Sequence, residues 1–188
     1  MSLERALKTA RTLIDQLISD SDFYKFFDQL LKASVNSYQN EGKLLCCGNG
    51  GSSCDAAHFC EELVGRFREN RAALPAMALN EAGVLTCVAN DFGYQQVFSR
   101  QVEAYAKEPD LLILLSTSGN SQNLIEAAKV AKQKGVKVIA LLGKDGGVLK
   151  QYLDNYYIFP GETSDRIQEL HMLVLHYLVE EIEKNLFN

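Results

Sequence analysis

The spacing of hydrophobic positions changes along the chain and separates a helical N-terminal part from an alternating α/β part. Residues 3–18 and 23–35 carry apolar side chains three or four positions apart, which predicts two amphipathic helices. From residue 41 onward, short continuous apolar runs alternate with helical patterns. Such runs are typical of strands that are buried on both faces of a parallel sheet.

The predicted architecture is an α/β three-layer sandwich, Rossmann-like or flavodoxin-like, with a five-stranded parallel sheet preceded by an N-terminal helical hairpin. We expect one domain over residues 1–188, with the N-terminal helices in 1–40 and the α/β core with its long C-terminal helix in 41–188. Residues 90–93 are expected to form a loop. Strands are predicted at 43–47, 76–79, 111–115, 136–142 and 156–159, and helices at 51–66, 83–89, 94–106, 121–134, 146–152 and 164–186.

The C-terminal helix is apolar on almost every side over residues 172–179, MLVLHYLV. A helix at the surface of a protein shows one apolar stripe, whereas a helix that is apolar all round is buried. We therefore expect this helix to lie in a subunit interface. His171, next to this run, is expected only to pack.

Composition excludes several classes of function. The 188 residues include 19 basic and 24 acidic side chains, so no broad basic face for nucleic acid is expected. There is no apolar run of about 18 residues and no N-terminal signal core, which predicts a cytoplasmic protein without a membrane partner. The five cysteines form no CxxC pair and are expected to be reduced and mostly buried.

A glycine-rich loop, GNGG, follows the first predicted strand. Asn49, Gly50 and Gly51 lie where the backbone could approach a ligand closely and present its N–H groups. The loop matches neither the dinucleotide fingerprint nor the Walker A motif. From these residues alone, a ligand-binding loop and a simple tight turn are equally good interpretations.

A hydroxyl-rich loop, STSGNS, follows the third predicted strand and opens a helix. Ser116, Thr117, Ser118 and Ser121 could bind a phosphate beside free helical N–H groups, without any lysine or arginine. The alternative is N-capping, for which one hydroxyl is enough. The position at a strand end favours the phosphate site.

Two pairs of polar residues lie on predicted helices. His58 and Glu62 are four residues apart and share a face, which makes them a candidate metal or proton-transfer pair. Gln168 and His176 are eight residues apart on the terminal helix, and this spacing is a weak signal. A buried neutral histidine is the simpler interpretation of His176. Residues 90–91, Asn-Asp, either form a turn or accept hydrogen bonds from sugar hydroxyls.

Taken together, these stretches resemble the sugar-isomerase (SIS) domain and, within it, the bacterial phosphoheptose isomerases. The resemblance implies an aldose–ketose isomerase that converts sedoheptulose 7-phosphate to D-glycero-D-manno-heptose 7-phosphate through an enediol. This reaction is the first step of ADP-heptose and lipopolysaccharide core synthesis. The motifs that carry the resemblance lie at residues 47–70, 88–104, 116–127, 143–147 and 165–176.

The resemblance also implies roles for single residues and a partner. It implies a homotetramer with active sites at subunit interfaces, with Glu62 as the base and His176 as the acid. It implies one zinc ion per subunit, bound by His58, Glu62, Gln168 and His176. It implies substrate contacts from Asn49, Gly50, Gly51, Glu62, Asn90, Asp91, Ser116, Thr117, Ser118, Ser121 and Gln168.

A second function remains open at this point. The same domain occurs as a non-enzymatic partner of the bacterial replication initiator, and such relatives look to have lost the carboxylate and the histidine at positions 62 and 176. This chain keeps Glu62 and His176. Because buried ionisable groups are costly to keep without a use, we favour the enzyme.

Overall fold

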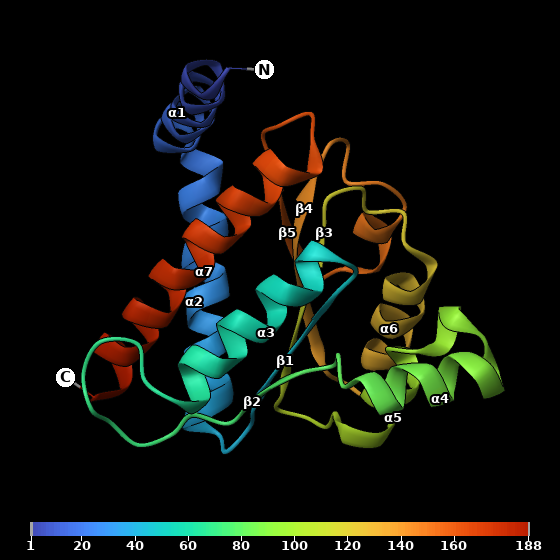
Figure 1. Ribbon diagram of the computed structural model, residues 1–188. Helices are drawn as coiled ribbons and strands as arrows, with labels where there is room; N and C mark the ends of the chain where they lie inside the picture. The colour runs from blue at the N-terminus through green and yellow to red at the C-terminus, as the bar shows by residue number, and fades with distance from the viewer. Residues whose placement is uncertain (1, 188) are drawn as a thin grey trace.

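The computed structural model describes residues 2–187 and contains a five-stranded parallel sheet (Figure 1). The order of strands across the sheet is β2-β1-β3-β4-β5, and each neighbouring pair is parallel. The predicted parallel α/β sheet is confirmed, with strand ends within one residue of those expected. The strands are β1 (Leu44–Gly48), β2 (Ala76–Ala78), β3 (Leu111–Ser116), β4 (Lys137–Gly143) and β5 (Asn155–Phe159).

Helices cover both faces of the sheet, which gives the three predicted layers (Figure 1). Alternate strand residues point to opposite faces, so Leu44 and Cys46 belong to one apolar core and Leu45 and Cys47 to the other. The first core is closed by α2 (Ser21–Gln39), α3 (Gly51–Val64) and α7 (Ser164–Phe187). The second is closed by α4 (Ala82–Phe92), α5 (Ser99–Tyr105) and α6 (Gln122–Gln133).

Helix α1 (Leu3–Ser19) projects beyond the end of α2 (Figure 1). Only Asp20 separates the two helices, which leaves no loop long enough to fold them side by side. The two predicted helices therefore form, but they do not pack as a hairpin. The apolar stripe of α1, including Leu3, Leu7 and Ile18, remains exposed.

Three local predictions were wrong. Residues 90–93 were expected to be a loop, yet α4 continues to Phe92 and places Asn90 and Asp91 in its last turns. The helix ends only at Gly93, whose φ of 87° favours glycine. The helix expected over 94–106 is divided into a short 3-10 turn (Tyr94–Gln96) and α5, and the one expected over 146–152 is a 3-10 turn at Leu149–Tyr152.

Helix α7 is apolar on two sides but buried on only one. Its inner side packs into the first core through residues such as Leu175 and Val179. On its outer side, Leu173 and Tyr177 are about half exposed. Burial of this outer side against another subunit stays a prediction.

Within residues 2–187, no helix is long and apolar enough to cross a membrane. The five cysteines are all free thiols. Cys46, Cys47 and Cys60 are buried, whereas Cys54 and Cys87 are exposed.

His171 packs in the core, as expected. Its Nε2–H group donates to the Leu142 carbonyl at 3.1 Å, and its ring meets Phe159 edge to face. Burial lowers the pKa of His171 from 6.5 to about 4, although the hydrogen bond to Leu142 opposes part of this shift.

We expect acidification to destabilise the fold through His171. The folded-state pKa lies below the unfolded value, so the unfolded state takes up a proton first and stability falls as the pH drops from 6.5 towards 4. His171→Gln keeps a donor for Leu142 but cannot titrate. Between pH 7 and pH 5 this variant should lose about 2 kcal/mol less unfolding free energy than the unmodified protein, measured by urea titration. Equal losses in the two proteins would contradict this prediction.

Candidate active site

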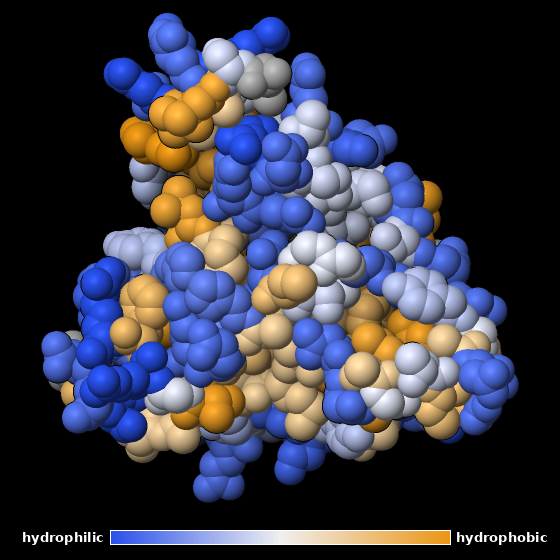
Figure 2. Space-filling view, viewed as in Figure 1, coloured by the Kyte–Doolittle hydropathy of each residue, from blue (hydrophilic) through white to orange (hydrophobic). Residues whose placement is uncertain are grey.

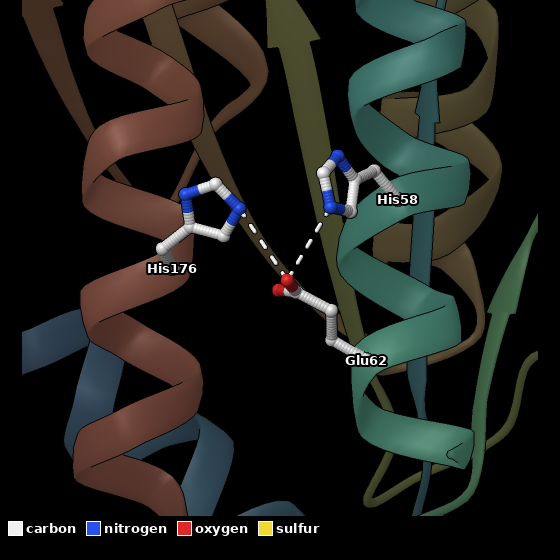
Figure 3. A group of neighbouring side chains, drawn as sticks. All are labelled: His58, Glu62 and His176. Carbon is white, nitrogen blue, oxygen red and sulfur yellow. Dashed lines mark ion pairs between the residues drawn. The ribbon is translucent and has the colours of Figure 1, made fainter. Parts of the chain in front are cut away.

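The carboxylate of Glu62 lies between two imidazoles, one from its own helix and one from α7 (Figure 3). His58 Nε2 lies 3.3 Å from Glu62 Oε1, and His176 Nε2 lies 3.4 Å from the same oxygen. Potential ligand atoms of the three side chains all lie within 4.8 Å of one another. Imidazole and carboxylate are ordinary zinc ligands, and both can transfer protons.

Local sequence and packing explain why these side chains meet. His58 and Glu62 are one turn apart on α3, and both side chains lie on the side of α3 that faces α7 (Figure 3). Helices α3 and α7 each follow a strand of the same parallel sheet, so they run in the same direction and pack side by side (Figure 1). His176 on α7 therefore faces Glu62 within one chain.

Glu62 is poorly solvated. Its side chain is 10% exposed, and its Oε2 atom has no hydrogen-bond partner among the described residues. Burial raises the pKa of Glu62 above its usual value, while His176 and then His58 oppose the shift. A carboxylate with a raised pKa and one unused oxygen can take and return a proton or complete a metal site.

Aromatic contacts orient the imidazole of His176. The ring of Phe67 stacks on it with centroids 5.8 Å apart and planes 16° apart. The ring of His58 meets it edge to face at 5.1 Å. Phe67 was not identified from the sequence, because an aromatic residue in a charged loop carries no signal of what it will contact.

A second, polar pocket of about 160 Å³ lies at the carboxyl edge of the sheet. Helices α3, α6 and α7 all begin at this edge, so their free N–H groups and the positive ends of their dipoles face the pocket. No lysine or arginine is among its lining residues. These features suit an anion such as a phosphate. The pocket is lined by Asn49, Ser52, Leu115, Ser116, Thr117, Ser118, Ser121, Ser164 and Gln168.

The hydroxyl groups of this pocket differ in their hydrogen-bond partners. Ser116 Oγ accepts from the Gly119 amide at 3.0 Å and so shapes its own loop. Thr117 Oγ1 lies 3.0 Å from Ser164 Oγ. Ser121 is the N-cap residue of α6 but makes no side-chain capping bond, which leaves its hydroxyl free for a ligand.

Gln168 lies at this pocket. Its Nε2 donates to Ser52 Oγ at 3.2 Å. The approach requires Gly51, because a Cβ there would lie 2.7 Å from the Gln168 amide atoms. Gln168 is eight residues before His176, so their α-carbons are about 12 Å apart along α7. Metal binding by Gln168 stays a prediction.

The side-chain amide of Asn49 is hydrogen-bonded to other side chains of the protein. Its amide pairs with the Asn123 amide in both directions, at 2.9 and 2.8 Å, and its Oδ1 also accepts from Tyr94 Oη at 2.9 Å. Gly50 beside it has a φ of 56°, and the space around its α-carbon is open. Gly50 can therefore offer backbone groups to a ligand, and a substrate contact by Asn49, which lines the pocket, stays a prediction.

The structure does not bring Asn90 and Asp91 to this pocket. They are exposed near the end of α4, where Asn90 Nδ2 donates to Asp91 Oδ1 at 2.7 Å. Their predicted contacts with substrate remain untested. By contrast, Ser52 and Ser164 line the pocket and were missed by the sequence analysis. Both lie in the first turn of a helix, a position that could have indicated them.

A larger cavity of about 540 Å³ lies at the opposite edge of the sheet, where Leu111 and Lys137 begin their strands. Ligands of parallel α/β sheets bind at the other, carboxyl edge. The buried carboxylate of this cavity, Asp110, already pairs with Lys43. We therefore place the site at α3 and α7.

Comparison with known proteins identifies the family of this chain. The SIS domain family matches residues 9–143. The phosphoheptose isomerase of Fusobacterium nucleatum is 46% identical over 187 residues, which covers 100% of this chain and 96% of that protein. The phosphoheptose isomerase of Glaesserella parasuis is 48% identical over 178 residues and covers 94% of this chain and 93% of that protein.

Solved structures point to the same family. The phosphoheptose isomerase of Francisella tularensis superposes with a TM-score of 0.92 at 33% identity, covering 97% of this chain and 96% of that chain. The one from Neisseria gonorrhoeae superposes with a TM-score of 0.90 at 35% identity, covering 97% of both chains. The resemblance inferred from the motifs is confirmed, and the chain belongs to the phosphoheptose isomerase family of SIS domain proteins.

Proposed function

We propose that this protein is an isomerase that converts sedoheptulose 7-phosphate to D-glycero-D-manno-heptose 7-phosphate, a precursor for lipopolysaccharide core synthesis. The observation that carries the proposal is the buried carboxylate of Glu62 between His58 and His176. Kinship with phosphoheptose isomerases supports the choice of substrate. The alternative, a non-enzymatic partner of the replication initiator, has no use for this cluster.

The reaction moves one proton between neighbouring carbons. The base takes a proton from C1 of the ketose, which leaves a cis-enediol, and the same proton or its replacement then returns to C2. Meanwhile a proton leaves O1 and one is added to O2, so that the aldose forms without net change of atoms. Glu62 suits the base because burial raises its pKa, and His176 suits the acid at the oxygens.

The two oxygens of Glu62 allow a division of labour. Oε1 faces both imidazoles, whereas Oε2 has no partner among the described residues and is free to take a proton. The polar pocket at Ser116–Ser121 would hold the phosphate group near the start of α7, where Gln168 precedes His176 by about 12 Å of helical rise. Phosphate binding would thereby place C1 and C2 near Glu62.

The cluster also fits a zinc ion. His58, Glu62 and His176 offer two nitrogens and a carboxylate within reach of one another, and Gln168 could supply a fourth ligand after turning away from Ser52. A bound zinc would polarise the sugar oxygens during proton transfer.

We propose a homotetramer with active sites near subunit interfaces. Hydrophobic side chains gather on the exposed part of α1 (Figure 2). Between α1 and the outer side of α7 lies an apolar groove of about 280 Å³, whose lining includes Ile14, Ile18, Leu173 and Tyr177. Exposed apolar surface of this kind is typical of subunit contacts. A monomer in sedimentation velocity would contradict this assembly.

Glu62→Gln should lower turnover of sedoheptulose 7-phosphate by roughly 10²–10⁴-fold, because the amide cannot accept the C1 proton. Glu69→Gln is the control, since Glu69 is exposed in the loop after α3 and lies outside the histidine cluster. We expect the control to keep near-normal turnover and both variants to keep the circular dichroism of the folded protein. Near-normal turnover by Glu62→Gln would contradict the mechanism, and inactivity of the unmodified protein would favour the partner-protein function.

Ser121→Ala should raise KM for the sugar phosphate by about tenfold, because one hydrogen bond to a charged group is lost. The melting temperature should change little, because the Ser121 hydroxyl makes no capping bond. Ser53→Ala, on the first turn of α3 but not among the residues that line the pocket, serves as the control. Steady-state kinetics of the three proteins test this prediction, and an unchanged KM in Ser121→Ala would place the phosphate elsewhere.

Removal of metal by a strong chelator should abolish most of the turnover, and added Zn²⁺ should restore it. The metal-free protein should stay folded, because the cluster lies at the edge of an apolar core that needs no metal to close. Metal content by atomic absorption and turnover are measured on the same samples. Full turnover by protein shown to be metal-free would contradict a role for zinc.

A further inference from the structure

Arg71 lies in the loop after α3 and is almost completely buried, with 3% of its side chain exposed. Its guanidinium makes an ion pair with α7, where Nε donates to Glu183 Oε1 at 2.8 Å. It also donates to backbone carbonyls at the end of α3. These acceptors are Glu62 O at 2.8 Å, Leu63 O at 2.7 Å and Gly65 O at 3.0 Å.

The hydrogen bonds of Arg71 to α3 include one to the backbone of Glu62, the proposed base. The last carbonyls of a helix have no partner within it, and a cation there also interacts favourably with the helix dipole. Arg71 occupies this position and holds the carbonyl of Glu62 itself. It therefore fixes the backbone from which the Glu62 side chain extends.

The contacts with α7 reach His176 by two routes. Glu183 lies seven residues after His176, two turns along the same face of α7. Glu183 Oε1 also accepts from the Phe67 amide at 3.3 Å, and the Phe67 ring stacks on the imidazole of His176. The buried ion pair between Arg71 and Glu183 thus connects the backbone of Glu62 with the residues that position His176.

We propose that Arg71, through its ion pair with Glu183, is a positioning residue that sets the Glu62 carboxylate relative to His176. Arg71 contacts neither the Glu62 carboxylate nor the His176 imidazole. It acts through the backbone of α3 and through Glu183. A buried ion pair often adds little stability compared with apolar residues of similar volume, so a role in geometry is a reason to keep it. Displacement of a reacting group by about 1 Å can cost roughly 10²-fold in rate. The proposal rests on the proposed isomerase function.

The chain offers a matched control on the same two elements. Arg68 from the same loop donates to Glu180 of α7 at 3.1 Å. The side chain of Arg68 is 63% exposed, it donates to no carbonyl of α3 among the described contacts, and it lies over the outer face of the Phe67 ring. Exposed pairs of this kind contribute little, so Arg68 tests the effect of a cation in this loop that lacks the buried contacts with Glu183 and the end of α3.

The experiment compares Arg71→Lys and Glu183→Gln with Arg68→Lys and Glu180→Gln. Lysine keeps the charge but loses the planar fork that donates in several directions at once. We expect kcat to fall about tenfold or more in the first two variants, with KM within about twofold, because the phosphate pocket lies at the other end of both helices. Zinc affinity, measured by chelator competition without substrate, should weaken about tenfold or more. The two control variants should stay within about twofold of the unmodified protein in all three quantities.

A kcat and a zinc affinity unchanged in folded Arg71→Lys, with only a lower melting temperature, would overturn the proposal by showing a merely structural role. If Arg71→Lys does not fold, Glu183→Gln decides by the same two measurements. Failure of the proposed function is distinguished by the unmodified protein, which would then show no turnover. In that case the zinc affinities of the four variants still support or overturn the positioning role.

Discussion

The packing of α3 against α7 is the interaction on which the rest of the site depends. Both helices follow strands of one parallel sheet and run in the same direction over a shared apolar core. Their first turns border the polar pocket, and their later turns carry Glu62 and His176. One interface therefore sets both the distance between the two chemical centres and the alignment of the side chains within each.

The two ends of the site use different electrostatics. The pocket at the carboxyl edge relies on hydroxyls and helix N-termini, so it can hold an anion without a lysine or arginine, in a chain whose net charge is −5. At the other end, the ionisable side chains of His58, Glu62 and His176 lie close together and are partly buried. Burial raises the pKa of Glu62, and the neighbouring imidazoles limit the shift. A raised pKa makes this carboxylate a stronger base than an exposed carboxylate.

Much of this could be read from local patterns. The five strands appear as short apolar runs, and the three central ones are buried on both faces, which leaves no polar side in their sequence. His58 and Glu62 could be paired in advance, because four residues make one helical turn. The hydroxyls of Ser116–Ser121 could be placed at a helix start, because the loop directly follows a strand. Local turn propensity failed at Asn90 and Asp91, where capping by Glu81 and a stop at Gly93 kept α4 helical.

The sequence by itself determined the kinds of element, the order in which they occur and the residue types that could carry chemistry. Only the tertiary structure decided which of these meet. The eight-residue spacing of Gln168 and His176 did not indicate which residues they contact. In the folded protein, Gln168 contacts Ser52 and His176 contacts Glu62. The buried contacts of Arg71 had no signal in the charged loop that contains it. Such pairings depend on how whole helices dock through their apolar faces, and no spacing along the chain encodes that geometry locally.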